Sequence, residues 1–318
     1  MKLSKLKENI VKRKSRFVQR LLIFILFVLV LTLSILFVKN LVNKYIYNGN
    51  SIVHLKNEWQ KYNYQEVYEI SQSILEKEPF NNTALIYHGY SAFFLSLSQT
   101  ETSVSQSLID ESINSMRIAL QNAKIKTVPQ LEYMLGKAYF YKDSISSYHY
   151  YADLVIMYLN RASKDGYKAE DIPEYLGLSY ASLGMTMESI AAFTKALLTR
   201  ESDLLLLSIA EQYFNAGQMV ASEQYLYRIS QDCKDDKINE KAHLLLGKIY
   251  LSQKKYSDAE KEFLLILEKN ENSADGYYGL GVIYESQGDL IKARSNWRTA
   301  LKKQSNHPDA LKKLSEYK

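Results

Sequence analysis

Four glycines fall within residues 276–289, GYYGLGVIYESQGD, at a spacing that invites comparison with phosphate-binding loops. Glycine clusters at the start of a helix can bind phosphate, because free backbone N–H groups there donate to the anion. The spacing here is G-x-x-G-x-G, which matches neither G-x-G-x-x-G nor a loop that ends in Lys-Ser or Lys-Thr. Two of these glycines lie in the middle of an expected helix, and no strand precedes them. We therefore predict no nucleotide cofactor at this segment.

The side chains that bind metals or perform catalysis are scattered along the chain. Cys233 is the only cysteine, which excludes an internal disulfide and a cysteine-based metal site. The histidines, none of which has a partner at metal-ligand spacing, are His54, His88, His149, His243 and His307. The acidic loop at 232–236 lacks the spacing of a calcium-binding loop, and no Ser-His-Asp set can be assembled. We predict no catalytic residue, no metal site and no cofactor, so the chain is not expected to be an enzyme.

Small and aromatic residues recur with a fixed spacing of 34 between residues 241–267 and 275–301. The pairs that share this offset are Gly247 and Gly281, Tyr250 and Tyr284, Ala259 and Ala293, and Phe263 and Trp297. A small residue is needed where two antiparallel helices cross closely, and an aromatic residue fills the wedge to the next unit. Because no segment alternates with period two, no sheet is expected.

Earlier segments contain the same positions. The small residues of the successive first helices are Gly89, Gly136, Gly177, Ala210, Gly247 and Gly281, and the aromatic residues three positions after them are Tyr139, Tyr180, Tyr213, Tyr250 and Tyr284. This pattern resembles the tetratricopeptide repeat (TPR) family, with L-G-x-x-Y on a first helix and a small and an aromatic residue on a second. The resemblance implies an all-α, right-handed superhelical solenoid of antiparallel helix pairs. About seven units would span residues 48–307, and residues 308–318 would form a C-terminal capping helix.

The run LLIFILFVLVLTLSILFV at residues 21–38 contains no charged residue and is long enough for a transmembrane helix. It is longer than the apolar region of a cleaved signal peptide, and no small-x-small site follows it closely, so we predict an uncleaved signal anchor. Residues 39–47 would be a linker or an extension of the helix. Residues 1–20 carry eight Lys and Arg residues against Glu8 alone, which predicts a cytoplasmic N-terminus and an extracytoplasmic, periplasmic array.

The net charge of the whole chain is +5, and this basic tail accounts for all of the excess. Nucleic-acid binding needs a basic face on the folded part of a protein, so no nucleic-acid partner is expected. The tail itself is explained as a topology signal with contacts to lipid headgroups. Membrane contact is thus predicted through residues 21–38, and the oligomeric state is left open.

The TPR resemblance implies that partner proteins bind along a concave face lined by first helices. The residues that the repeat register places on this face are Tyr90, Phe93, Tyr133, Lys137, Phe140, Leu178, Leu207, Glu211, Phe214, Leu244, Lys248 and Tyr278. The alternative is that several of them pack inside the solenoid. The Ser/Thr-rich segment 95–107 and the tyrosine-rich segment 139–151 are expected as long loops in neighbouring units and form a second candidate interface. The alternative is that they extend the helices and pack on each other. A mostly apolar face suits an amphipathic helix or an extended apolar segment of a partner.

We therefore expect a membrane-anchored scaffold for a multiprotein assembly on the exported side. Envelope biogenesis, secretion and the periplasmic structure of a flagellar motor are all compatible, by analogy of fold alone. One alternative is a cytoplasm-facing membrane adaptor in protein insertion or quality control, which needs the opposite topology. A membrane-bound enzyme would need a polar constellation that the sequence does not provide.

Overall fold

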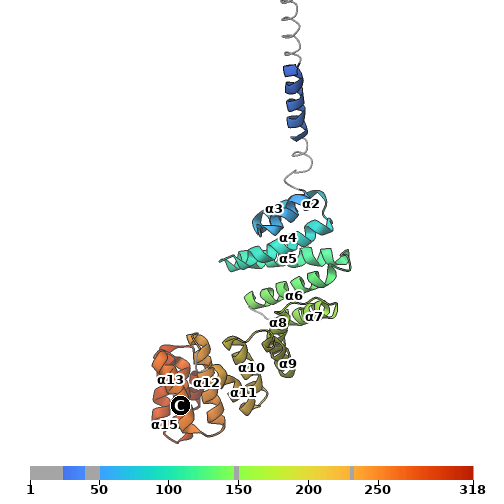
Figure 1. Cartoon of the computed structure of the whole chain (residues 1–318). Coiled ribbons are helices and arrows are strands. Elements are labelled where there is room, and N and C mark those ends of the chain that lie inside the picture. The colour runs from blue at the N-terminus through green and yellow to red at the C-terminus, as the bar shows by residue number, and fades with distance from the viewer. Residues whose placement is uncertain (1–23, 40–50, 147–149, 230–232, 318) are drawn as a thin grey trace, which may run out of the picture. The chain divides into compact units, whose positions relative to one another are not determined.

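The structure is a computed structural model that describes residues 24–39, 51–146, 150–229 and 233–317, and the secondary structure within these residues is entirely helical (Figure 1). Consecutive helices form antiparallel hairpins. The hairpins are α2 (Ile52–Gln60) with α3 (Tyr64–Lys77), α4 (Asn82–Leu97) with α5 (Thr102–Gln121), α6 (Val128–Ile145) with α7 (Ala152–Lys164), α8 (Ile172–Ser182) with α9 (Thr186–Leu197), α10 (Asp203–Asn215) with α11 (Met219–Ile229), α12 (Asp236–Ser252) with α13 (Tyr256–Lys269) and α14 (Ala274–Ser286) with α15 (Leu290–Lys303). A single helix, α16 (Pro308–Glu316), follows α15 and packs against it.

The chain divides into two compact units, Met1–Ala123 and Lys124–Lys318. The first unit contains α2–α5 and the second contains α6–α16. In the second unit, α9 packs on α10 and α13 packs on α14, so the second helix of one hairpin supports the first helix of the next. The first helices also meet directly, because α10 contacts α12 and α12 contacts α14.

The N-terminal apolar run is helical over residues 24–39, and its side chains are exposed along this whole length. The expected span begins at residue 21, so its first three residues lie outside the described part, as do the basic tail and residues 40–47 of the expected linker. Among the described residues, no helix has both the length and the apolar character that crossing a membrane requires. The transmembrane anchor therefore stays a prediction.

Polar side chains at the helix starts explain why many first helices begin where they do. Asn81, Ser202 and Ser273 each accept a hydrogen bond from a backbone N–H in the first turn of the helix that follows. His307 has the same role at α16, where its Nδ1 accepts from the N–H of Ala310 at 3.1 Å. Each cap satisfies one of the backbone donors that a helix start leaves free.

In five of the hairpins the turn between the two helices contains a residue in the left-handed region. Gly184, Gly217 and Gly288 fill this position with φ values of 69°, 73° and 84°. In two other hairpins the aligned residues are Tyr62 and Lys254, both with φ of 59°. A side chain at such a φ is strained, so these two turns are less favourable than the glycine turns.

The small residues of the first helices lie against large side chains of the second helices. A Cβ built on Gly247 would lie 2.6 Å from the ring of Phe263, and one on Gly177 would overlap the ring of Phe193. The same packing explains the glycines at 276 and 279, because a Cβ at either would be too close to side chains of α13. The glycine-rich segment of α14 is therefore a close helix contact.

Serine hydroxyls add a second link at the same crossings. Ser189 Oγ donates to the carbonyl of Gly177 at 2.8 Å, and Ser222 Oγ donates to the carbonyl of Ala210 at 2.7 Å. Both serines are fully buried. The backbone carbonyl thus gives the buried hydroxyl the partner it needs, whereas Ala259 and Ala293 fill the same position in the two later hairpins without a hydrogen bond.

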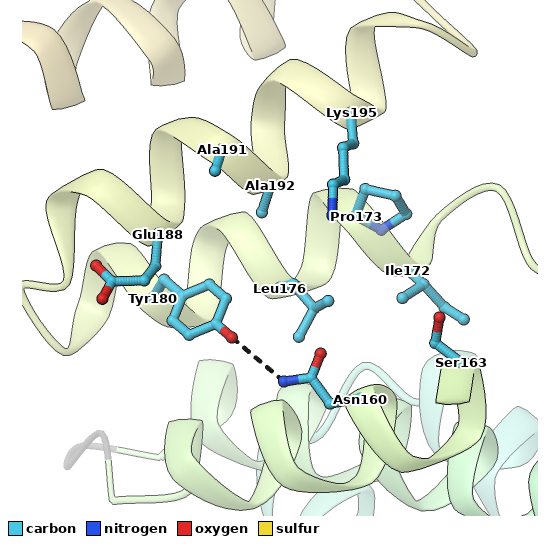
Figure 2. Close-up of a pocket in the computed structure, with 10 residues that line it drawn as sticks. All are labelled: Asn160, Ser163, Ile172, Pro173, Leu176, Tyr180, Glu188, Ala191, Ala192 and Lys195. Carbon is cyan, nitrogen blue, oxygen red and sulfur yellow. Dashed lines mark hydrogen bonds between the residues drawn. The ribbon is translucent and has the colours of Figure 1, made fainter. Parts of the chain in front are cut away.

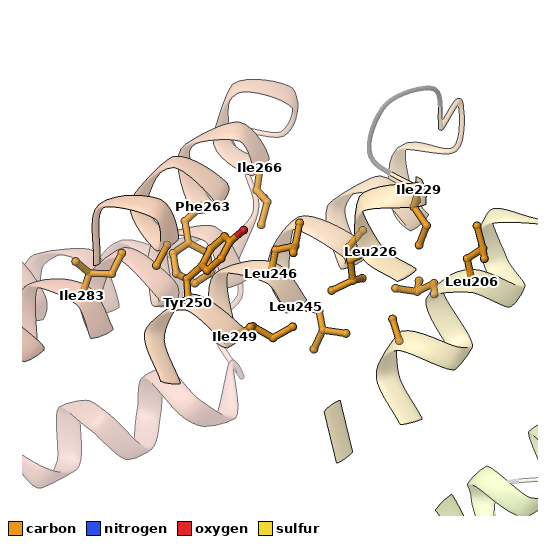
Figure 3. Close-up of a cluster of buried hydrophobic side chains, with 14 of the residues drawn as sticks. Leu206, Leu226, Ile229, Leu245, Leu246, Ile249, Tyr250, Phe263, Ile266 and Ile283 are labelled. Carbon is orange, nitrogen blue, oxygen red and sulfur yellow. The ribbon is translucent and has the colours of Figure 1, made fainter. Parts of the chain in front are cut away.

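The core of the second unit is formed by apolar side chains from successive hairpins. Figure 3 shows one continuous cluster, in which Leu226 of α11, Leu246 of α12 and Phe263 of α13 lie in sequence. Ile283 of α14 continues the same cluster. The hairpins thus bury their apolar faces against one another, as expected of a repeat array.

In the first unit, Trp59 is the centre of an aromatic cluster. Its ring centroid lies 5.4 to 6.0 Å from the rings of four other residues, which are Tyr64, Tyr87, Tyr90 and Phe94. These rings come from α2, α3 and α4. Aromatic packing of this kind stabilises the first hairpin, where Leu55 occupies the position that holds glycine in later repeats.

The two segments expected as long loops are largely helical, which corrects that expectation and agrees with the alternative that they extend the helices. Helix α4 continues through Leu97 and α5 begins at Thr102, so only a short turn remains within residues 95–107. Ser105 Oγ donates to the carbonyl of Ser96 at 3.0 Å and joins the two helix ends. Helix α6 likewise extends through Ile145, and residues 147–149 lie outside the described part. The extra residues therefore lengthen these helices.

Candidate functional site

The first helices of the second unit form a row, which we call the first-helix row: α6, α8, α10, α12 and α14. The residues that follow the small packing position in these helices are Lys137, Leu178, Glu211, Lys248 and Val282. A residue beside the packing glycine points away from the helix it packs against, because successive residues are about 100° apart around the helix axis. The residue at this position therefore lies on the outer surface of the row.

The structure places the expected partner-binding residues in three environments. Leu178, Glu211 and Lys248 are exposed. The half-buried ones are Lys137, Phe140, Phe214, Leu244 and Tyr278. The buried ones, with their exposed fractions, are Tyr90 (4%), Phe93 (1%), Tyr133 (9%) and Leu207 (2%). Only the first two groups are available to a partner.

The burial of four residues corrects the expectation of a surface role, and neighbouring side chains explain it. Tyr90 packs on Trp59 with ring centroids 5.7 Å apart, and Phe93 lies against Phe94 at 5.4 Å. Leu207 belongs to the core cluster that joins α10 to α12. These side chains stabilise the array, which is the alternative role considered above.

Lys137 is the centre of a polar and aromatic cluster at the α6 end of the row. Its Nζ lies 2.9 Å from Asp171 Oδ2 and donates to the Tyr133 hydroxyl at 3.2 Å. The same ammonium lies 5.3 Å from the ring centre of Tyr133 and 5.2 Å from that of Tyr175. The charge of Lys137 is therefore already paired within the chain and is less available to a binding partner.

The electrostatics of this cluster favour the ion pair. Burial alone would lower the pKa of Lys137, but the hydrogen bond and charge of Asp171 outweigh it and raise the pKa. Burial, together with the hydrogen bond to Asp171, raises the pKa of Tyr133. Lys137 is therefore charged and Tyr133 neutral at ordinary pH, and neither group is poised for proton transfer.

The middle of the row carries two charged side chains, Glu211 and Lys248, that are close enough to influence each other but form no ion pair. Within the described residues, Glu211 and Lys248 make no side-chain hydrogen bond and no ion pair. Glu211 is accessible to solvent, yet the protein around it desolvates the carboxyl group and raises its pKa, while Lys241 and Lys248 oppose this shift. A charged group in such surroundings gains from any partner that supplies the opposite charge.

The apolar surface beside these charges comes from three side chains that are only partly covered. Phe214 of α10 and Leu244 and Leu251 of α12 pack on the core cluster and keep part of their surface exposed. An interface of this kind combines an apolar centre with charged groups at its edge. The row at α10 and α12 therefore has the composition of a protein-binding surface.

Helix α16 covers the C-terminal end of the row. Lys313 Nζ lies 2.7 Å from Glu285 Oε2, and the Tyr317 hydroxyl donates to Glu285 Oε1 at 2.6 Å. Tyr278 lies 5.2 Å from the ring of His307, and burial raises its pKa to about 12. The charges on α14 are thus satisfied by the capping helix, which leaves the middle of the row as the open surface.

The structure also assembles a Ser-His-Glu arrangement in the first unit that the sequence analysis missed. His88 Nδ1 lies 2.9 Å from Ser71 Oγ, and His88 Nε2 lies 2.9 Å from Glu111 Oε1. The three residues come from α3, α4 and α5, so no local spacing in the sequence reveals them. A nucleophile, however, must be reachable and must give its proton to the base.

Ser71 meets neither requirement. Its side chain is fully buried, and its hydroxyl donates to the carbonyl of Tyr68 at 2.8 Å. His243 forms a comparable link between α12 and α13, with Nδ1 2.6 Å from Glu262 Oε2. Both histidines act as links between helices. In the part of the chain that the structure describes, no group of three His, Cys, Asp or Glu side chains could hold a metal ion.

Comparison with known proteins gives no match to a family model and no match among curated proteins. Among solved structures, the chain is similar to the C-terminal part of a TPR repeat-containing protein from Cytophaga hutchinsonii. The two are 13% identical, the match covers 82% of this chain and 98% of that one, and the TM-score is 0.57.

Two further solved structures have lower TM-scores. One is a tetratricopeptide repeat protein from Parabacteroides merdae, with 18% identity, 83% and 96% coverage and a TM-score of 0.47. The other is YrrB, described as a TPR protein with an unusual peptide-binding site, with 19% identity, 63% and 97% coverage and a TM-score of 0.45. Likeness at these identities concerns the fold alone. The first of the three matches, together with the hairpin series described above, shows that this chain has the tetratricopeptide-repeat fold.

Proposed function

We propose that this chain is a membrane-anchored scaffold that binds partner proteins along the first-helix row between α8 and α12. The observation that carries the proposal is the pair Glu211 and Lys248. They stand on neighbouring first helices beside apolar side chains and, among the described residues, make no hydrogen bond or ion pair. Charged groups at an apolar surface fix the register of a partner and contribute to specificity. A catalytic role would instead need an accessible nucleophile or base in a pocket.

The partner that suits this surface is a segment with an apolar face and charges of both signs. Leu178 adds an exposed apolar side chain on α8, next in the row to Glu211 on α10. An amphipathic helix or an extended segment would place its apolar side chains on Phe214 and Leu244. Its basic residue would face Glu211, and its acidic residue would face Lys248.

A membrane anchor at residues 21–38 is part of the proposal. Its support is the uncharged run itself and the uniformly exposed, apolar side chains of the helix over residues 24–39. Burial in the apolar interior of a membrane would be favourable for these side chains, which no other described residue covers. The basic residues before the run favour a cytoplasmic N-terminus and an extracytoplasmic array.

Partner binding can be tested by site-specific crosslinking in cells. A photo-crosslinking amino acid at Leu178 should capture one or a few proteins. We expect Glu211→Lys or Lys248→Glu to reduce capture at least about tenfold, which corresponds to the loss of one buried charge pair. Lys302→Glu, on an exposed position of α15, is the matched control and should have no effect. Equal capture by all variants would contradict binding along the row.

The topology can be tested with the single cysteine. Cys233 is partly exposed, and burial raises the pKa of its thiol, so a membrane-impermeant thiol reagent should be applied at mildly alkaline pH. Labelling in intact cells, after permeabilisation of any outer membrane, is expected. A Cys233→Ser variant with Ser4→Cys in the tail should show the reverse pattern. Labelling of Cys233 only after lysis would support the cytoplasm-facing adaptor.

A further inference from the structure

A cleft of about 280 Å³ lies among α7, α8 and α9, on the side of the second helices (Figure 2). Its floor is apolar and includes Ile172 and Leu176 of α8 and Ala192 of α9. Leu176 and Leu178 are two residues apart and therefore lie about 200° apart around α8. The cleft thus opens away from the first-helix row.

Two of the side chains of α9 that line the cleft are small. Aligned on the aromatic packing positions, Ala191 and Ala192 correspond to Gln224 and Tyr225 in α11. The later second helices also carry larger residues there, namely Lys261 and Glu262 in α13 and Ser295 and Asn296 in α15. Among these four helices, α9 alone has alanine at both positions.

The next hairpin shows what fills the space there. Tyr225 stacks on Tyr213 with ring centroids 5.6 Å apart, and Arg228 lies 5.6 Å from the centre of the Tyr225 ring. In the cleft, Tyr180 takes the place of Tyr213, and Ala192 offers it no ring on which to stack. The Tyr180 hydroxyl instead accepts a hydrogen bond from Asn160 Nδ2 at 3.2 Å.

Unpaired charges stand at the two ends of the cleft. Glu188 and Lys195 both line it, and neither side chain has a hydrogen bond or an ion pair among the described residues. They are seven residues apart on α9, which places them on one face about 10.5 Å apart. Figure 2 shows the two alanines between them.

We propose that this cleft binds an amphipathic helix of a partner protein, whose bulky apolar anchor occupies the space above Ala192. The volume equals that of roughly nine water molecules, which leaves room for one large side chain. A helix presents residues seven apart at the spacing of Glu188 and Lys195. It also packs its side chains into the groove between two neighbouring helices.

The charges set the direction of the partner. A helix antiparallel to α9 meets Lys195 first with an acidic residue and Glu188 seven residues later with a basic residue. An acidic residue near the start and a basic residue near the end also suit the dipole of the partner helix. The ligand class is therefore an acid-first amphipathic helix with an apolar anchor between the charges.

Two synthetic peptides provide the test. Both are alanine-rich helices of about 18 residues with a central Trp, long enough to be helical in isolation. The first has Glu seven residues before Lys, and the second has the two charges exchanged. Fluorescence anisotropy with the detergent-solubilised full chain should show at least about tenfold tighter binding of the acid-first peptide.

Two kinds of variant decide the outcome. Ala192→Tyr copies Tyr225 and should weaken binding at least about tenfold. Ala191→Gln copies Gln224 and should also weaken binding at least about tenfold, so it can replace the first variant if that one folds poorly. Glu188→Lys with Lys195→Glu should invert the preference between the peptides. Lys248→Glu, on the first-helix row, should leave both affinities unchanged, which separates this site from the proposed function.

The proposal is overturned if neither peptide binds saturably, if both bind equally, or if Ala192→Tyr and Ala191→Gln leave binding unchanged. If the chain self-associates and Ala192→Tyr abolishes this self-association, the cleft binds a second copy of the chain. That outcome would also overturn the assignment to a partner helix.

Discussion

Lys137 Nζ lies 2.9 Å from Asp171 Oδ2, a contact that joins α6 to the residue preceding α8. The side chains are 19% and 34% exposed, so water screens this pair less than a surface pair. Asp171 occupies the N-cap position of α8 but makes no side-chain cap hydrogen bond. Its carboxylate therefore stabilises the contact between hairpins in place of its own helix.

The first prediction concerns the coupling between these two residues. In a double-mutant cycle with Lys137→Ala and Asp171→Ala, we expect a coupling energy of about 1–2 kcal/mol by chemical denaturation. The control cycle is Lys261 with Asp258, a pair that is 70% and 50% exposed, and its coupling should be close to zero. Equal coupling in both cycles would contradict the role assigned to Lys137.

The second prediction concerns the contact between glycine and a large side chain. Gly177→Ala should destabilise the protein by about 1–3 kcal/mol, because the added methyl group overlaps the ring of Phe193. The α10–α11 hairpin has Ala210 and Leu226 at the aligned positions. Adding Phe193→Leu should therefore recover about 1 kcal/mol relative to the sum of the single changes, measured by thermal unfolding. A purely additive double variant would argue against this explanation.

The third prediction concerns a strained turn. Lys254 has φ of 59° at the position where Gly184 and Gly288 stand in other hairpins. Lys254→Gly should raise the free energy of unfolding by about 0.5–1 kcal/mol, because the relief of strain exceeds the added entropy of the unfolded chain. Lys254→Ala keeps the strain and should give no gain. Urea denaturation of the three proteins makes the comparison.

The fourth prediction concerns alkaline pH. Burial and the hydrogen bond from Tyr68 to Glu111, 2.7 Å long, raise the pKa of Tyr68 to about 12 from an ordinary value of 10.0. The folded state thus keeps a proton that the unfolded state loses. The contribution of Tyr68 is complete below pH 10 and is lost as the pH rises to about 12.

Tyr68→Phe provides the measurement for this effect. Its unfolding free energy should fall less steeply between pH 10 and 12 than that of the parent protein. The slope should differ only in this window, since the phenol is neutral in both states at lower pH. Identical slopes in urea titrations would show that Tyr68 is not responsible.

The repeat positions could be read from the sequence because they depend on contacts within a hairpin. Gly247 and Phe263 belong to one hairpin, so a glycine and an aromatic residue at the right spacing are enough to identify the crossing. Turn residues such as Gly217 follow from the same local logic. Features that depend on contacts within one hairpin can thus be predicted from a single sequence.

The exposure of residues on the first-helix row was harder to predict from the sequence, because it depends on how neighbouring hairpins pack. Leu207 and Leu244 occupy the same repeat position, yet the first is buried and the second is only partly covered. The link from Ser71 through His88 to Glu111 needs three helices, and the segment 95–107 looked like a loop because serine is common there. Each of these depends on packing that composition does not encode.

Ala191 and Ala192 also have a consequence for protein engineering. The backbone of α9 is helical like that of α11, but α9 has alanine at the two positions where α11 has Gln224 and Tyr225. Replacing Gln224 and Tyr225 with alanine should create a similar cleft in the next repeat of the array. Opening or filling such clefts one at a time could determine which partner helices bind side by side on a single chain, and in what order.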